Sequence, residues 1–276
     1  MYKWDAEEYH KNSSEQQKWA QELIQKLELK GSERVLDIGC GDGKVTAELA
    51  KLLSSGSVLG IDNSEEQISF ARKNFPSKKF PNIAFRMMDA RNLSFNSEFD
   101  VVFSNAALHW VIDHLLVLKG IKKSLKPSGK VLLQMGGRGN AAKILEVMET
   151  MMKSKKWSKY FENFTFPYGF YGPEEYNDWL EQTGLKAKRV ELIPKDMIQK
   201  GKEGLSAWIR TTWLPYTQRV PEELQEEFIG KLVDKYVEIH PLDKDGFVHV
   251  PMVRLEVEAE NRNKIPATPD NTAFMR

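Results

Sequence analysis

The stretch VLDIGCGDG, residues 35–43, carries the strongest local signal in this sequence of 276 residues. Residues 34–38 form a short apolar run that is typical of a buried strand, and residues 44–53 place apolar side chains at helical intervals. The glycines between them permit a tight turn with positive φ and a close approach of the backbone to a ligand. The stretch therefore predicts a strand, a glycine turn and a helix whose first N–H groups point at that ligand.

The same alternation continues along the first half of the chain. Further strands are expected at residues 58–62, 82–87, 99–104 and 130–135. Helical spacing follows the first of them, where Asn63 or Ser64 is a suitable N-cap. Strands and helices that alternate with short connections indicate an α/β fold, with a parallel sheet covered by helices on both faces.

From about residue 136 onward the alternation is less regular. The pattern predicts helices at 140–152, 173–183, 203–213 and 221–240, a strand at 185–193, and a hairpin or bent strand at 247–257. No strand separates the last two helices. We therefore expect residues 195–245 to form a helical cap inserted between the last two strands.

Two acidic residues accompany the glycine turn. Asp37 lies just before it, and Asp62 ends the next strand, about twenty residues beyond the glycines, where a carboxylate can bind the paired hydroxyls of a ribose. The spacing G-x-G-x-G differs from the dinucleotide pattern G-x-G-x-x-G, and Asp37 would repel the phosphates of a dinucleotide. A cationic ligand with an ammonium or sulfonium group fits these residues better.

Two sets of motifs resemble known enzyme families. Between residues 34 and 135, five stretches resemble the successive motifs of the class I S-adenosylmethionine-dependent methyltransferases: VLDIGCGDGKVTAELA, GIDNSEEQISFAR, MMDARNL, FDVVFSNAALHW and LKPSGKVLLQM. Later stretches resemble trans-aconitate methyltransferase and related small-acid carboxyl methyltransferases: FYGPEEYNDWLEQTGL, AWIRTTWLPY and PEELQEEFIGKLVDKY. The resemblance implies a Rossmann-like fold, with a largely parallel seven-stranded sheet, helices on both faces and a helical cap inserted before the last strand.

The sequence pattern and the resemblance together predict how the chain is divided. The expected regions are N-terminal lid helices at 1–30, a cofactor-binding core at 31–194 and 246–260, a substrate cap at 195–245 with 140–170 contributing, and a mobile tail at 261–276.

Cofactor contacts follow from the family's motifs. The residues that the resemblance assigns to S-adenosyl-L-methionine are Tyr9, Gln16, Asp37, Gly39, Cys40, Gly41, Asp62, Asn63, Asp89, Ala90 and Asn105. Asp62 would accept both ribose hydroxyls, and Asp89 would accept the exocyclic amine of the adenine. The alternative for Asp37 and Asp62 is a role in capping or turns, and Cys40 is most simply a small residue that fills space.

The methyl acceptor decides which other residues matter. A carboxylate arrives ionised and needs a cation rather than a base, whereas an amine, hydroxyl or carbon acceptor needs a base, for which His109 is the candidate. The expected substrate residues are His109, Trp110, Arg138, Tyr171, Arg210 and Trp213. The alternatives are a structural histidine, arginines in solvent, and aromatic side chains that only pack.

Composition excludes several classes of protein. The 40 Lys and Arg against 39 Asp and Glu give a net charge of +1, which argues against a general nucleic-acid binder. No apolar run reaches the ~18 residues of a membrane span, and the N-terminus has no apolar core of a secretory signal. The one cysteine can form neither an internal disulfide nor a multi-cysteine metal site. We expect a cytoplasmic monomer or homodimer that binds no metal, membrane or nucleic acid.

These observations lead to one main hypothesis. The chain is expected to be an enzyme that methylates a small molecule, with the carboxylate of an organic acid as acceptor and an O-methyl ester as product. Two alternatives stay open. One is a methyltransferase for an amine, hydroxyl or carbon acceptor with His109 as base, and the other is a nucleotide-binding protein without catalysis.

Overall fold

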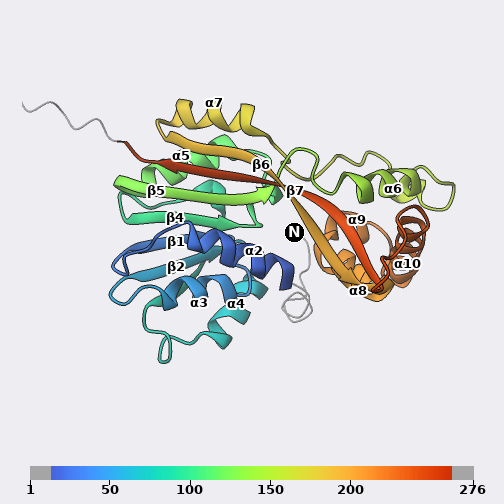
Figure 1. Cartoon of the computed structure of the whole chain (residues 1–276), viewed down its shortest axis with the longest axis horizontal. Helices are drawn as coiled ribbons and strands as arrows, with labels where there is room; N and C mark the ends of the chain where they lie inside the picture. The colour runs from blue at the N-terminus through green and yellow to red at the C-terminus, as the bar shows by residue number, and fades with distance from the viewer. Residues whose placement is uncertain (1–13, 263–276) are drawn as a thin grey trace, which may run out of the picture.

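The computed structural model describes residues 14–262 of the chain, with side chains from residue 18 onward. A seven-stranded sheet with the order β3-β2-β1-β4-β5-β7-β6 forms the centre of this part (Figure 1). The parallel strands are β1 (Arg34–Ile38), β2 (Ser57–Asp62), β3 (Ile83–Met87), β4 (Phe99–Asn105) and β5 (Leu125–Gly136). The last two strands, β6 (Lys186–Lys200) and β7 (Phe247–Glu260), pair antiparallel. The largely parallel Rossmann-like sheet expected from the sequence is thus confirmed.

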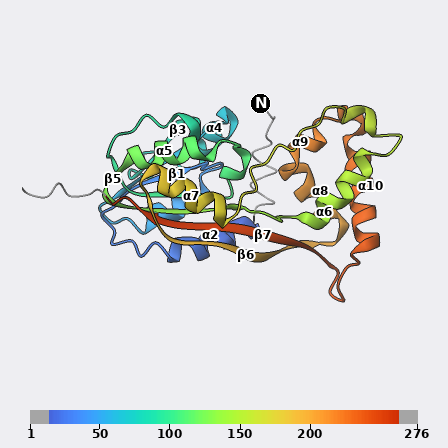
Figure 2. The same ribbon diagram turned by 90° about the horizontal axis from the view of Figure 1, so that it is seen from above.

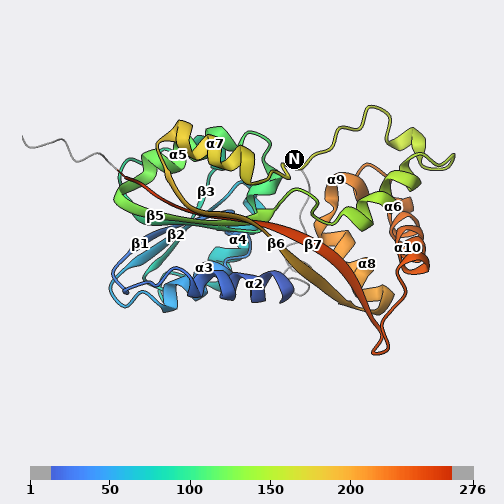
Figure 3. The same ribbon diagram turned by 45° about the horizontal axis from the view of Figure 1, so that its top comes forward.

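Helices cover both faces of the sheet, as the alternating pattern predicts. On one face lie α2 (Ser14–Gln25), α3 (Lys44–Lys51) and α4 (Glu65–Asn74), and on the other lie α5 (His114–Ser124) and α7 (Pro173–Thr183) (Figure 3). Adjacent residues of β1 enter different cores, because successive side chains of a strand point to opposite faces. Val35 packs with α2, α3 and α4, whereas Leu36 packs with α5 and α7.

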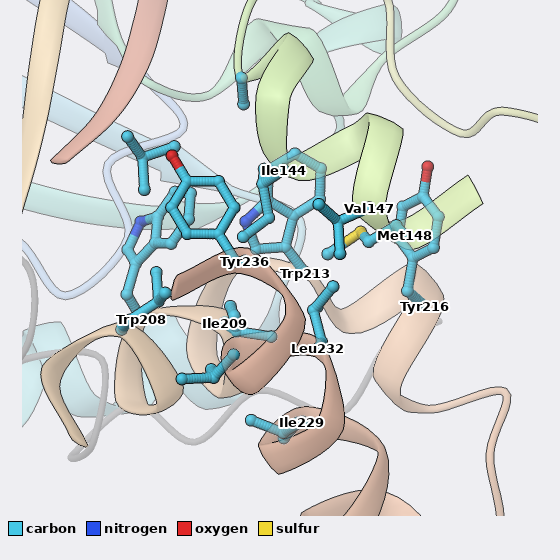
Figure 4. Packing of buried hydrophobic residues seen from close by; sticks show 14 of the residues in the cluster. Ile144, Val147, Met148, Trp208, Ile209, Trp213, Tyr216, Ile229, Leu232 and Tyr236 are labelled. Carbon is cyan, nitrogen blue, oxygen red and sulfur yellow. The ribbon is translucent and has the colours of Figure 1, made fainter. Parts of the chain in front are cut away.

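Beyond the edge of the parallel strands, β6 and β7 continue as a two-stranded ribbon. β5 pairs with β7 only from Glu260 to Arg254, whereas β6 pairs with it as far as Phe247. Three helices join the two strands at the far end of the ribbon: α8 (Gly201–Thr212), α9 (Leu214–Thr217) and α10 (Glu222–Ile239). These helices and α6 (Ala142–Met152) form a group beside the sheet (Figures 1 and 2), held together by a separate apolar core that Figure 4 shows.

Three boundaries differ from the sequence expectation. β6 extends to Lys200 rather than ending near residue 193, so the inserted helices begin at Gly201 and not at 195. Of the two forms expected at 247–257, the hairpin is wrong and the single strand is found: β7 runs to Glu260, and its pairing with β6 has no turn. Asn261, expected in a mobile tail, is buried and donates its side-chain N–H groups to the carbonyls of Leu125 and Lys126.

Within residues 14–262, no helix has both the length and the apolar character that crossing a membrane requires.

Candidate active site

A cavity lies between the carboxyl edge of the parallel strands and the helices carried by the ribbon. Ligands of open α/β sheets bind outside this edge, at the point where the strand order reverses, which here lies between β1 and β4. From the sheet side the cavity is lined by Ile38, Gly39, Gly41, Asp62, Asn63, Gln67, Met88, Asp89, Ala90 and residues 106–111. From the other side it is lined by Trp19, Asn140, Tyr168, Phe170, Met197, Trp208, Thr212, Trp213, Met252 and Arg254.

The glycine turn after β1 forms part of the cavity wall. Gly39 has φ +74, and a Cβ there would lie 2.1 Å from the Cβ of Ala107. Gly41 has φ +52, and a Cβ there would meet nothing within 4 Å. Close packing against the segment that follows β4 therefore requires glycine at residue 39, whereas glycine at residue 41 leaves open space at the cavity wall for a ligand.

Asp62, at the end of β2, is held in a fixed orientation. Its Oδ2 accepts the N–H of Gly41 at 3.0 Å, and its Oδ1 accepts the N–H of Ser64 at 2.9 Å. Burial raises the pKa of this carboxyl above its ordinary value. The two backbone contacts thus tie the glycine turn to the start of α4 and fix the carboxylate at the cavity wall.

Three of the expected cofactor residues do not reach the cavity wall. Asp37 is buried beneath the turn, accepts the hydroxyl of Thr46 at 2.6 Å, and has its pKa raised by burial to about 7. Cys40 is buried against Gly60, and burial raises the pKa of its thiol. Asn105 ends β4, but the lining residues are the two alanines that follow it. Asp37 and Cys40 therefore support the turn from below.

Asp89 follows β3 and lies on the wall beside Met88 and Ala90. Arg91 donates from Nε at 3.0 Å and from a terminal guanidinium nitrogen at 2.5 Å to this carboxylate. These hydrogen bonds and the positive charge of Arg91 lower the pKa of Asp89. Asp89 is therefore ionised at neutral pH.

Aromatic rings form a large part of the cavity wall. Tyr168 and Phe170 are stacked with centroids 5.3 Å apart, and Trp110 lies edge-on to Tyr168 at 5.0 Å. Trp213 contacts both Tyr168 and Trp208, at 5.5 Å and 5.7 Å. Figure 4 shows Trp208 and Trp213 in the apolar core of α6, α8 and α10, so these rings line the cavity and pack at the same time.

Arg254 of β7 brings a positive charge to the cavity. The residue is 3% exposed, and its guanidinium lies 5.5 Å from the ring centre of Trp19 in α2. Arg254 was not among the residues expected from the sequence. A signal was present, because alternation puts this arginine in phase with Val248, Val250 and Met252, all buried apolar residues.

His109 is buried in the cavity wall near Arg254. Its Nδ1 accepts the N–H of Gly136 at 3.4 Å, and Gly136 is the residue opposite Arg254 in the β5–β7 pair. Burial, and then the positive charge of Arg254, hold the pKa of His109 well below its ordinary value. The imidazole is therefore neutral at neutral pH and is a weak base.

The other expected substrate residues lie outside the cavity. Arg138 is exposed and forms ion pairs with Glu174 and Glu175. Arg210 forms an ion pair with Glu226 on α10. Tyr171 donates its hydroxyl to the carbonyl of Ile112 at 2.7 Å. Nearby partners thus hold all three away from the wall, which Trp110, His109 and Trp213 do line.

Two expected cofactor contacts cannot be placed. Tyr9 lies outside the described residues, and so does the side chain of Gln16.

Residues 29–184, more than half of the chain, match the family model described as a methyltransferase domain. The chain belongs to this family. It is a methyltransferase, and its cofactor is S-adenosylmethionine.

Similar proteins extend the match over most of the chain. A trans-aconitate 2-methyltransferase of Methylobacterium nodulans is 27% identical over 274 residues, covering 92% of this chain and 97% of its own. An uncharacterized methyltransferase of Schizosaccharomyces pombe is 30% identical over 197 residues, covering 70% and 74%. Among solved structures, a putative methyltransferase from Bacillus halodurans has a TM-score of 0.61 at 16% identity, covering 88% and 99%. This last likeness supports the fold.

The cavity fits this cofactor. Two carboxylates stand at the ends of the neighbouring strands β2 and β3, where they can accept hydroxyl and amine hydrogens of a nucleoside. The open space at Gly41 admits a ligand against the backbone.

Proposed function

We propose that this methyltransferase converts the carboxylate of a small organic acid into its methyl ester. The observation that carries the proposal is the buried guanidinium of Arg254 in the cavity wall. A guanidinium presents N–H groups in a planar fork that a carboxylate accepts at two points. In the sheet, β1, β4 and β5 separate Arg254 on β7 from Asp62 on β2, so cation and cofactor carboxylate have distinct positions.

In this proposal the two sides of the cavity have different tasks. The sheet side would hold the cofactor, with Asp62 and Asn63 at the ribose, Asp89 and Ala90 at the adenine, and Gly39 and Gly41 at the methionine part. The core would comprise residues 31–194 and 246–260, and the helices between β6 and β7, with residues 140–170, would select the acid. S-adenosylmethionine, when bound, supplies a methyl group that its sulfonium activates for transfer.

The chain's own residues would then bind and orient the acceptor. A carboxylate with a pKa of about 4 is already a nucleophile at neutral pH, so no side chain has to remove a proton. Arg254 would bind and orient it, and the aromatic wall would exclude water that otherwise solvates the anion. Relatives named trans-aconitate 2-methyltransferase add support for a carboxylic acid as the acceptor.

Acceptors that need a base receive less support. His109 is the candidate base at the cavity, and its lowered pKa makes it a weak one. Its Nδ1 already accepts the N–H of Gly136, which leaves the proton on Nε2. An aromatic wall suits an ammonium group through cation–π contacts, but the like charge of Arg254 disfavours a cationic amine.

Exchange of Arg254 for glutamine tests the proposal. Arg254→Gln should lower kcat/KM for the acid roughly 100-fold, because a bidentate pair with a charged group is lost. The dissociation constant of S-adenosylhomocysteine should change less than about threefold. Isothermal titration and steady-state kinetics measure the two effects separately.

A matched control is Arg138→Gln, which removes an exposed arginine outside the cavity and should leave both constants unchanged. Equal loss of cofactor and acid binding in Arg254→Gln would mean that Arg254 serves the cofactor, and unchanged kinetics would exclude its contact with the acid.

A further inference from the structure

The charges around the cavity restrict the charge of the acceptor. Among the described residues that line it, Arg254 is the one lysine or arginine. The other titratable groups that line it are the carboxyls of Asp62 and Asp89 and the imidazole of His109, whose pKa is lowered, and none of the three is a cation at neutral pH. A second carboxylate on the acid would lose its water and find no second cation among the described lining residues, which is unfavourable.

The rest of the acceptor side is apolar. Beside Arg254 the wall consists largely of rings and thioethers: Trp19, Tyr168, Phe170, Met197, Trp208, Trp213 and Met252, with Trp110 of the sheet side edge-on to Tyr168. Such walls bind flat or flexible apolar bodies, and methionine adapts its shape to them. They offer little to a small molecule that is polar throughout.

Neutral hydrogen-bond groups complete this side. The side-chain nitrogens of Trp208 and Trp213 and the hydroxyl oxygen of Thr212 are buried and have no hydrogen-bond partner among the described residues. All three residues line the cavity, and Trp208 and Thr212 lie four positions apart on one face of α8. Buried polar groups normally have partners, and an indole N–H can only donate. A neutral oxygen on the acceptor would supply the missing partner.

We infer that the acceptor is a monocarboxylic acid with an apolar body. A neutral oxygen on that body leaves binding of the acid unchanged or strengthens it, whereas a second charge weakens it. This inference rests on the proposed esterification. Arg254 selects the single carboxylate. Trp208, Thr212 and Trp213, in α8 or just after its end and here called the α8 wall, select the body.

Matched acids test the inference on the unaltered enzyme. Transfer of labelled methyl is measured with cinnamate, 4-methoxycinnamate and 4-carboxycinnamate, and with octanoate and octanedioate. Each monocarboxylate should have kcat/KM at least tenfold above its dicarboxylate counterpart, and 4-methoxycinnamate should equal or exceed cinnamate. A dicarboxylate or trans-aconitate that reacts as well as the monocarboxylates, or monocarboxylates that do not react at all, would overturn the inference.

A designed second cation makes the test sharper. Thr212→Arg places a guanidinium in the α8 wall and should shift the preference toward the dicarboxylates by at least tenfold. Thr212→Val is the matched control, since it removes the hydroxyl without adding charge and should leave the preference for monocarboxylates in place. A preference that is the same in Thr212→Arg and Thr212→Val would contradict a selection by charge.

The result also separates this inference from the proposed function. Esters formed only from di- or tricarboxylates would overturn the inference and leave the esterification standing. Methylation of amines or alcohols with no acid as acceptor would overturn both.

Discussion

At the scale of single residues, Asp37 couples protonation to stability. Its pKa rises to about 7 in the folded chain because it is buried, whereas the unfolded value is near 3.8. The folded state therefore binds more protons between these values, and stability is lost as pH rises from about 4 to about 7. Above pH 7 the buried, ionised carboxyl lowers the free energy of unfolding.

Asp37→Asn should remove this cost. We expect the melting temperature of the variant to exceed that of the unaltered chain at pH 8 and to lose most of this advantage at pH 4.5. Thermal unfolding followed across this range measures the difference. A difference that does not vary with pH would show that Asp37 is not the titrating group.

Asp62 is the residue on which cofactor affinity should depend most directly. In Asp62→Asn one of the two backbone N–H groups, of Gly41 or Ser64, loses its acceptor, and the carboxylate charge is gone. Affinity for S-adenosylhomocysteine should fall roughly 10- to 100-fold, because hydrogen bonds to charged groups are worth ~1.5–3 kcal/mol.

Asp100→Asn is the matched control for this change. Asp100 also accepts a backbone N–H, that of Arg34, but it lies at the amino end of β4. Calorimetry should find that Asp100→Asn binds S-adenosylhomocysteine with the affinity of the unaltered chain. Equal affinities in both variants would reject the role of Asp62.

At the scale of elements, two glycines of the turn after β1 have different roles: Gly39 is required for packing, and Gly41 leaves space for the ligand. Gly39→Ala should lower the melting temperature strongly, because its Cβ would lie 2.1 Å from that of Ala107. Adding Ala107→Gly to this variant should restore most of the lost melting temperature. Gly41→Ala meets no atom within 4 Å, so it should cost only about 1 kcal/mol of stability for its left-handed backbone.

Gly41→Ala should nevertheless weaken the binding of S-adenosylhomocysteine more than tenfold, since the added methyl enters the space for the ligand. Paired measurements of melting temperature and affinity distinguish the two positions. A normal affinity in Gly41→Ala would mean that no ligand approaches the backbone there.

Local patterns predicted the elements around this turn, and helix α7 farther along the chain, well. β1, α3, β2 and α7 lie within a few residues of their expected ranges, since buried strands and amphipathic helices have distinct periods. The length of β6 was underestimated because its residues beyond Ile193 are stabilised by pairing with β7, a partner some fifty residues away. Pairing of this kind leaves little trace in a local pattern.

At the scale of the whole molecule, the cavity joins parts that are far apart in the chain. Its sheet side follows from motifs, and Asp62, Asn63, Asp89 and Ala90 were predicted to meet there. The acceptor side depends on where β7 places Arg254, and two of the expected arginines, Arg138 and Arg210, lie outside the cavity. Arg138 and Arg210 are held by glutamates, and the sequence alone does not show which cations are neutralised in this way.

The chemical form of the product tests the proposed esterification most directly. The enzyme is incubated with methyl-labelled S-adenosylmethionine and the matched acids, and the product is treated with mild alkali. A methyl ester hydrolyses, so the label should be released as methanol, and its formation should depend on Arg254. Label that remains in an alkali-stable product, as in an N-methyl, C-methyl or ether product, would contradict it.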